Sequence, residues 1–321
     1  MNTIKLSRRE ALTRTGLLVG AGALGGRLPV SLASAETPSQ TSAAPFRYSL
    51  NMATIRGQKL GIVKEVEVAA KAGYDAIEPW VEALDAYVRE GGTLSDLKKR
   101  ITDTGLTVEG AIAFPEWIAD DEARRAKGFE RAKREMDMVA QIGGKRFAAP
   151  PSGATGLPKL DLTQAAERYR ALLEAGDQFG LTPELELWGF SKNLNQLGEC
   201  ICVAMETGHP RACVLVDVFH LYKGGTDIQG MRLLGASALQ VLHMNDYPAD
   251  PPREKIDDSY RMFPGDGTAP LTDILRLLQQ TGGQKVLSLE IFSRKHWTED
   301  PLEVARTGLE KMKATVAKAG L

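Results

Sequence analysis

Residues 213–220 read Cys-Val-Leu-Val-Asp-Val-Phe-His, an apolar run that ends on a carboxylate with an imidazole three positions later. An unbroken apolar run is typical of a strand buried on both faces of a parallel sheet. An ionised Asp217 at the end of such a strand is costly to bury unless a cation or a hydrogen-bond network receives it. Taken alone, the stretch predicts either a cation site or an Asp217 that caps the next helix beside a His220 packed in the core.

The same pattern recurs along the second half of the chain. Three further apolar runs end in a side chain that binds hard metal ions. With the first run they give the set Glu186, Asp217, His243 and Glu290. Four residues of this kind at the same end of successive strands predict a divalent-metal site.

Extended and helical patterns alternate along the chain and give eight strand–helix units. The first four expected strands are residues 46–51, 74–78, 106–112 and 145–149, and the four ligand-bearing runs follow. Most of the expected helices end in Gly before the next strand, which is the usual junction between a helix and a strand. Eight such units predict an α/β fold, a single-domain (β/α)8 TIM barrel, rather than an open sheet. The active site of such a barrel lies at the C-terminal ends of its strands, where the four ligands would line one half of the mouth.

The composition is that of an ordinary globular protein. Of the 321 residues, 43% are hydrophobic and 25% are charged, and the formal net charge is −1. This balance argues against a nucleic-acid partner. The three cysteines, Cys200, Cys202 and Cys213, have no zinc or redox spacing, so no essential disulfide is expected.

Residues 1–35 have the pattern of an export signal. Arg8 and Arg9 precede a modestly apolar run, residues 16–26, and the small residues 33–35 offer a cleavage site. The run is too short to span a bilayer. The segment resembles a twin-arginine signal peptide, with a Sec signal or a retained anchor as the alternatives.

Cleavage there would leave a flexible linker, residues 36–45, rich in Ser, Thr, Ala and Pro, and one catalytic domain, residues 46–321. The expected location is periplasmic or secreted, with no membrane contact after signal cleavage. Export of a folded protein suits an enzyme that takes up its metal before crossing the membrane.

The C-terminal half carries five short motifs. They are LELWGF from residue 185, DVFHLY from 217, HMND from 243, RMFPGDG from 261 and LEIF from 289. In this order and spacing they resemble the xylose isomerase-like barrels, the sugar phosphate isomerase/epimerase family. This family includes inosose isomerases, tagatose 3-epimerases and hydroxypyruvate isomerases. The resemblance covers roughly residues 46–317 and implies that the four ligands hold one divalent ion, Mn²⁺ first, with Mg²⁺ or Co²⁺ as alternatives. Three carboxylates and one imidazole also suit such a hard ion by their own chemistry.

The resemblance also implies roles for three side chains. Glu186 and Glu290 would be the two bases that remove and return a proton on opposite faces of the substrate carbon. His220 would hydrogen-bond the polarised substrate oxygen.

Three further residues are expected near the substrate. Arg261 offers a fork of donors for a substrate hydroxyl, carboxylate or phosphate, with a surface arginine as the alternative. Glu78 ends the second strand and would lie near the substrate or form a structural salt bridge. Trp188 would form an apolar wall for a sugar ring or pack in the core. The proline-rich residues 246–268 predict a loop over the barrel mouth.

These features predict a metal-dependent isomerase or epimerase of a sugar, keto-sugar or cyclitol, which moves a proton through an enediolate. The alternative keeps the metal site but eliminates water or an alcohol, as a lyase or dehydratase does. A DNA-repair endonuclease of the same fold would need more histidines than the four present. A barrel that only binds sugar is disfavoured by the complete ligand set. The expected partner is a small carbohydrate, and because phosphorylated sugars are mostly cytoplasmic, export favours a non-phosphorylated or 3-keto sugar. The sequence does not decide between a monomer and a homo-oligomer.

Overall fold

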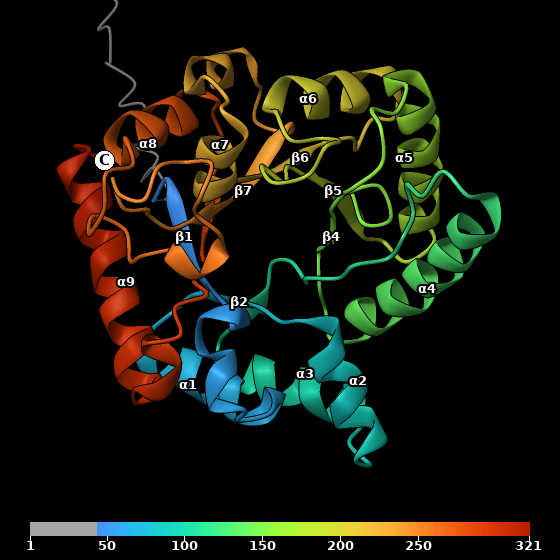
Figure 1. Cartoon of the computed structure of the whole chain (residues 1–321). Helices are drawn as coiled ribbons and strands as arrows, with labels where there is room; N and C mark the ends of the chain where they lie inside the picture. Colours follow the sequence, from blue (N-terminus) through green and yellow to red (C-terminus); the bar gives the residue numbers. More distant parts are fainter. Residues whose placement is uncertain (1–43) are drawn as a thin grey trace, which may run out of the picture. The chain divides into compact units, whose positions relative to one another are not determined.

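Eight parallel strands curl into a barrel in the computed structural model, which describes residues 44–321 (Figure 1). The strands are β1 (Phe46–Asn51), β2 (Ala76–Glu78), β3 (Thr107–Val108), β4 (Arg146–Ala149), β5 (Thr182–Glu186), β6 (Val214–Asp217), β7 (Leu239–Met244) and β8 (Lys285–Leu289). Their order in the sheet is β3-β2-β1-β8-β7-β6-β5-β4. The predicted barrel is confirmed. The expected targeting segment and most of the expected linker lie outside the described residues, so export stays a prediction.

The barrel closes between β3 and β4 through the segment that follows β3. The backbone N–H of Ala148 donates to the carbonyl of Ala111 at 2.9 Å, and Ile112 forms an isolated bridge with Trp80. Sequence analysis expected a strand over residues 106–112, whereas regular pairing ends at Val108. Ala111 and Ile112, which follow β3, contact β4 and the residues after β2. These contacts close the barrel wall without regular strand pairing.

Helices form the outer layer around the strands (Figure 1). They are α1 (Ile62–Ala72), α2 (Val81–Arg89), α3 (Leu94–Asp103), α4 (Glu122–Gln141), α5 (Leu162–Asp177), α6 (Leu197–Glu206), α7 (Val218–Gly224), α8 (Leu271–Gln280) and α9 (Pro301–Lys318). Short 3-10 helices add η2 (Met52–Gln58), η3 (Ile228–Leu233), η4 (Asp258–Tyr260) and η5 (His296–Thr298). No helix in the part of the chain that the structure describes is both long and apolar enough to cross a membrane.

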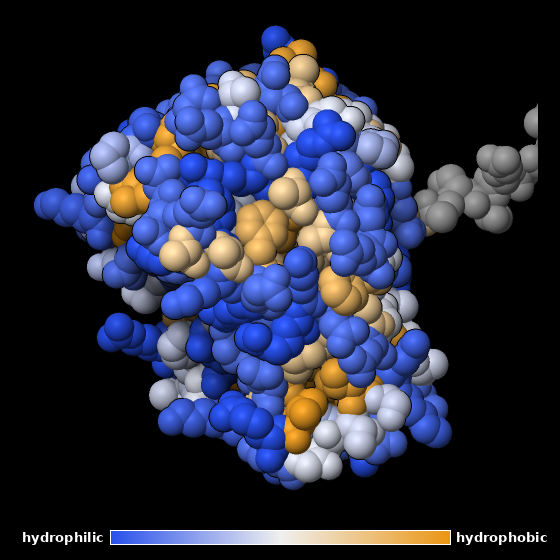
Figure 2. Space-filling view, turned by 90° about the vertical axis from the view of Figure 1, so that its right-hand side faces the viewer, coloured by the Kyte–Doolittle hydropathy of each residue, from blue (hydrophilic) through white to orange (hydrophobic). Residues whose placement is uncertain are grey.

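Helix α8 shows how the sequence pattern covers the barrel. Its apolar residues Leu271, Ile274, Leu275 and Leu278 recur at helical spacing and are all buried. Its polar residues face outward. The face of the molecule in Figure 2 is accordingly mostly hydrophilic, with apolar side chains visible only in patches.

The interior of the barrel is filled by side chains in layers. A small apolar cluster lies inside it, formed by Ile112, Ala148, Leu215, Val241 and Val286. Because successive side chains of a strand alternate in direction, the residue two positions after each of Leu215 and Val241 also points inward. These residues are Asp217 and His243, so the strands carry their polar ends above an apolar floor.

Candidate active site and metal centre

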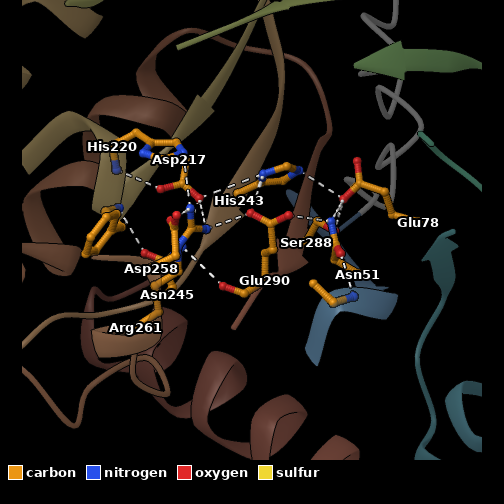
Figure 3. Close-up of polar contacts among 12 residues, drawn as sticks. Asn51, Glu78, Asp217, His220, His243, Asn245, Asp258, Arg261, Ser288 and Glu290 are labelled. Atoms are coloured by element: carbon orange, nitrogen blue, oxygen red, sulfur yellow. Dashed lines mark hydrogen bonds and ion pairs between the residues drawn. The ribbon is translucent and has the colours of Figure 1, made fainter. Parts of the chain in front are cut away.

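Asp217, His243 and Glu290 come together at the C-terminal ends of β6, β7 and β8. One donor atom from each lies within 4.8 Å of the others, and all three side chains are buried. Register explains the convergence, since Asp217 pairs directly with His243 across β6 and β7. The backbone N–H of Glu290 donates to the carbonyl of Met244, the residue after His243. Three of the four predicted ligands therefore form one group, which we call the triad (Figure 3).

The donor chemistry of the triad fits a divalent cation. Two carboxylates and one imidazole are the ligands that hard and borderline ions prefer. His243 Nδ1 lies 3.1 Å from Glu290 Oε2 and 3.8 Å from Asp217 Oδ2, yet neither ring nitrogen makes an aligned hydrogen bond within the described chain. Burial disfavours the charged imidazolium, but Glu290 and Glu78 outweigh it and raise the pKa of His243 well above its usual value. A bound cation would replace that proton.

Glu186 lies beside the triad but is not part of that group. It ends β5, where it pairs with Leu215, two residues before Asp217. Its carboxylate is buried, Oε2 has no hydrogen-bond partner among the described residues, and it lines the same cavity as Glu290. Burial raises the pKa of Glu186 to about 8, and the Glu290 carboxylate adds to the rise.

Glu290 is in the opposite electrostatic state. Burial alone would raise its pKa, but the positive charges of His243 and Arg261 outweigh burial and lower the pKa of Glu290 to about 2. The cavity thus holds one carboxyl group that favours its proton and one that favours ionisation.

Arg261 is buried at the centre of the site and is not a surface arginine. Its Nη1 donates to Asp217 Oδ2 at 2.7 Å and to Glu290 Oε2 at 2.6 Å. Its Nη2 donates to Asp258 Oδ1 at 2.6 Å and approaches His220 Nε2 at 3.1 Å. Although burial disfavours its charge, these carboxylates hold the pKa of Arg261 above its usual range. Arg261 therefore neutralises two members of the triad.

The predicted loop that carries Arg261 is anchored at its base. Asp246 and Met262 exchange two backbone hydrogen bonds of 3.0 and 2.9 Å. The Asp246 carboxylate accepts the backbone N–H groups of Gly265, Gly267 and Ala269. A side chain at Gly267 would start 2.4 Å from Asp246 Oδ1, so only glycine fits there. Sequence analysis did not single out Asp246; its place soon after a ligand-bearing strand was the available signal.

His220 lies in the wall of the cavity, on the first turn of α7. The helix starts directly at Asp217, whose carboxylate accepts the backbone N–H of His220 at 2.8 Å. Asp217 is therefore a helix cap, as one prediction for residues 213–220 had it, and the same carboxylate belongs to the triad that could hold a cation. Burial lowers the pKa of His220 to about 3, which keeps the imidazole neutral. Because Arg261 can only donate, Nε2 of His220 accepts and Nδ1 carries the proton.

Glu78 lies on the far side of His243 from Asp217 and is not among the residues that line the cavity (Figure 3). Its Oε2 is 3.0 Å from His243 Nε2, and Asn51 and Ser288 donate to the same oxygen. Sequence analysis missed Asn51 and Ser288. Asn51 ends β1 and could have been found as a polar strand end, whereas Ser288 gave no signal.

Aromatic side chains line much of the cavity above the triad. The volume of this cavity is about 200 Å³. The rings belong to Trp80, Phe114, Trp188, Phe190 and Phe292. Neighbouring rings contact one another around the cavity. The centroid distance is 5.2 Å from Trp80 to Phe114 and 5.1 Å from Trp188 to Phe190. Trp188 thus lines the cavity as predicted for a substrate wall, and four further aromatic residues join it.

The fold and the site define a class of (β/α)8 barrels with a buried carboxylate–histidine centre at the strand ends. Residues 66–315 match the family model of the xylose isomerase-like TIM barrel, and the chain belongs to this family of sugar isomerases and epimerases.

Individual relatives are distant. An inosose isomerase of Halalkalibacterium halodurans is 23% identical over 261 residues, which cover 80% of this chain and 92% of that protein. A 3-dehydroshikimate dehydratase of Pseudomonas aeruginosa is 24% identical over 241 residues, which cover 72% of this chain and 36% of that protein. Among solved structures, the IOLI protein with a bound zinc atom superposes with a TM-score of 0.79 at 20% identity, over 85% of this chain and 99% of that one.

Proposed function

We propose that this protein is a divalent-metal-dependent isomerase or epimerase of a keto-sugar or cyclitol. The observation that carries the proposal is the placement of Glu186 and Glu290 in one cavity beside the triad. They come from β5 and β8, strands separated by two others, so they approach a substrate from different directions. Two carboxylates so arranged can remove a proton from a substrate carbon and return it on another face.

The residues have distinct tasks in this reaction. Asp217, His243 and Glu290 would hold the cation, which when bound would acidify the C–H next to a substrate carbonyl. Glu290 and Glu186 exchange the proton at that carbon. His220, neutral and able to donate from Nδ1, would hydrogen-bond the substrate oxygen that gains negative charge. Arg261 holds the carboxylates in place and offers its guanidinium to a substrate hydroxyl.

The cavity favours an uncharged ring over an anionic substrate. Arg261 is the one Lys or Arg among its lining residues, and three carboxylates already engage that guanidinium. A phosphate or carboxylate would therefore meet Glu186 and Glu290 with no free guanidinium or ammonium group of the cavity lining, which leaves the proposed metal ion as its positive partner. The aromatic walls suit the apolar C–H face of a sugar or cyclitol ring.

Proton exchange in heavy water tests the proposal. The metal-loaded protein should incorporate deuterium next to the carbonyl of an unphosphorylated keto-sugar or inosose, followed by the isomerised or epimerised product. Chelator-treated protein should lose the exchange and regain it with Mn²⁺. Absence of exchange on every uncharged candidate, with exchange on a phosphorylated or carboxylated one, would contradict the substrate class. Absence of exchange on all of them would contradict the function.

A dehydratase is the second candidate. It is supported by the relative named 3-dehydroshikimate dehydratase and by the raised pKa of Glu186, which leaves a proton available for a departing hydroxyl. In the exchange experiment this activity appears as a product that has lost water. A dehydrated product with no isomer would replace the first proposal by the second.

A further inference from the structure

Glu78 makes its contacts within the site, and none of the lysines or arginines in residues 44–321 pairs with it. Its Oε2 lies 3.0 Å from His243 Nε2, and Ser288 Oγ and Asn51 Nδ2 donate to the same oxygen at 2.7 and 2.8 Å. Register fixes these neighbours, since Asn51 pairs with Glu78 across β1 and β2 while His243 pairs with Ser288 across β7 and β8. The two roles expected for Glu78, a place at the site and a structural ion pair, therefore meet at His243.

The amide of Asn51 links Glu78 to the triad. Nδ2 donates to Glu78 Oε2 and also to Glu290 Oε1 at 3.1 Å. Its oxygen is held in turn by the Trp80 indole at 3.1 Å and the backbone N–H of Ala53 at 2.9 Å. These two donors fix the amide with its nitrogen toward the carboxylates.

The other carboxylate oxygen, Glu78 Oε1, lies against Gly110, which has no side chain. A Cβ added to Gly110 would start 2.7 Å from Glu78 Oε1. Gly110 thus leaves space for a buried carboxylate whose Oε2 accepts hydrogen bonds from Asn51 and Ser288 and lies beside His243.

We propose that Glu78 is a positioning residue that fixes the ring of His243 so that Nδ1 faces Asp217 and Glu290. A neutral imidazole that binds a cation through one nitrogen keeps its proton on the other. Glu78 Oε2 is at the distance needed to accept that proton's hydrogen bond, which orients the ring and raises the basicity of Nδ1. The inference rests on the proposed metal site, but not on the identity of the substrate.

Metal affinity tests the inference directly. In Glu78→Gln, the dissociation constant for Mn²⁺ or Co²⁺, measured by calorimetry, should rise about 10- to 100-fold, and the visible absorption bands of bound Co²⁺ should change. Ser288→Ala, a milder change, should shift affinity in the same direction. Gly110→Ala keeps the carboxylate but displaces it, so it should also weaken metal binding.

Glu109→Gln is the matched control. Glu109 is equally buried, but it pairs with Arg47, Lys145 and Arg146 and has no contact with the triad. This variant should lose stability and keep its metal affinity and Co²⁺ spectrum.

The outcomes separate this inference from the proposed function. Unchanged affinity and spectrum in folded Glu78→Gln and Ser288→Ala, or an equal loss in Glu109→Gln, overturns the positioning role alone. A native chain that binds neither ion overturns both this role and the metal-dependent function.

Discussion

Arg261 Nη1 lies 2.6 Å from Glu290 Oε2, the same carboxylate oxygen that is 3.1 Å from His243 Nδ1. The same nitrogen contacts Asp217 Oδ2 at 2.7 Å. The guanidinium therefore contacts two carboxylates of the triad, where a bound cation would also offset the negative charge that the strands concentrate there.

Replacing Arg261 should make the fold depend on metal. In Arg261→Met, Asp217 and Glu290 lose their buried cationic partner, a change that typically costs about 3–5 kcal/mol. We expect a lower melting temperature in chelator and a larger rise on adding Mn²⁺ than in the native chain. Arg124→Met, which breaks the exposed pair with Glu116, is the control and should change neither value. An equal metal-induced rise in the native chain and Arg261→Met would contradict the account in which Arg261 and the cation offset the same carboxylates.

Substitution of Glu186 and of Glu290 should affect turnover and metal affinity differently. Glu186→Gln should lower turnover by roughly 10²–10⁴-fold because a proton-transfer group is lost, while metal affinity stays near native. Glu290→Gln should lose both turnover and metal, because Glu290 belongs to the triad. Measurement of turnover and metal content in the two purified variants tests this difference. Equal loss of metal in both would make Glu186 a fourth ligand, as the sequence pattern suggested.

Trp188 should contribute to substrate binding alone. Trp188→Ala removes one wall of the aromatic cavity and should raise KM about three- to tenfold, the usual worth of one aromatic contact. Trp188→Phe should restore most of the loss because it keeps an aromatic face. Steady-state kinetics on the substrate found by proton exchange measure both. A native KM in Trp188→Ala would show that the ring lies outside the bound substrate's reach.

Glu65 gives a pH-dependent prediction far from any ligand residue. Burial raises its pKa to about 7 from the ordinary 4.5, only partly opposed by Arg56, and Oε2 has no partner among the described residues. The folded chain therefore binds this proton more tightly than the unfolded chain. Stability is lost as the pH rises from 4.5 to about 7, and the full cost persists above that range.

Glu65→Gln should remove this cost. The variant should be more stable by roughly 2–3 kcal/mol at pH about 8, and no more stable than the native chain at pH about 4. Urea unfolding at the two pH values measures the difference. Glu67→Gln, an exposed neighbour on the same helix, should show no such gain. A gain of equal size at both pH values would exclude burial of a charge as its cause.

The sequence predicted the triad because parallel strands that end in polar residues meet at one edge of the sheet. It could not predict the place of Glu186, since the strand ends alone do not show that Glu186 pairs with Leu215 and not with Asp217. The relative register of neighbouring strands is set by three-dimensional packing. The two residues of offset leave Glu186 outside the triad.

In two other elements the local sequence pattern predicted part of the structure, and tertiary contacts determined the rest. The loop over residues 246–268 was predicted from its prolines, but its backbone anchor at Asp246 depends on contacts between residues about 20 positions apart. Helix α7 was predicted only through the alternative in which Asp217 caps the next helix, because the apolar residues after Asp217 fit a continuing strand equally well. The Asp217 carboxylate decides between them by capping the first turn.

The exchange of backbone hydrogen bonds between Asp246 and Met262 holds the two ends of the loop together, and Lys223 Nζ holds its middle through the carbonyls of Arg253, Glu254 and Ile256. Insertions or deletions before Asp258 would change the rim of the barrel while Asp258 and the Asp246–Met262 pair still hold the Arg261 guanidinium. The barrel can therefore change the shape of this edge during evolution while the carboxylate–histidine group beneath it keeps its arrangement.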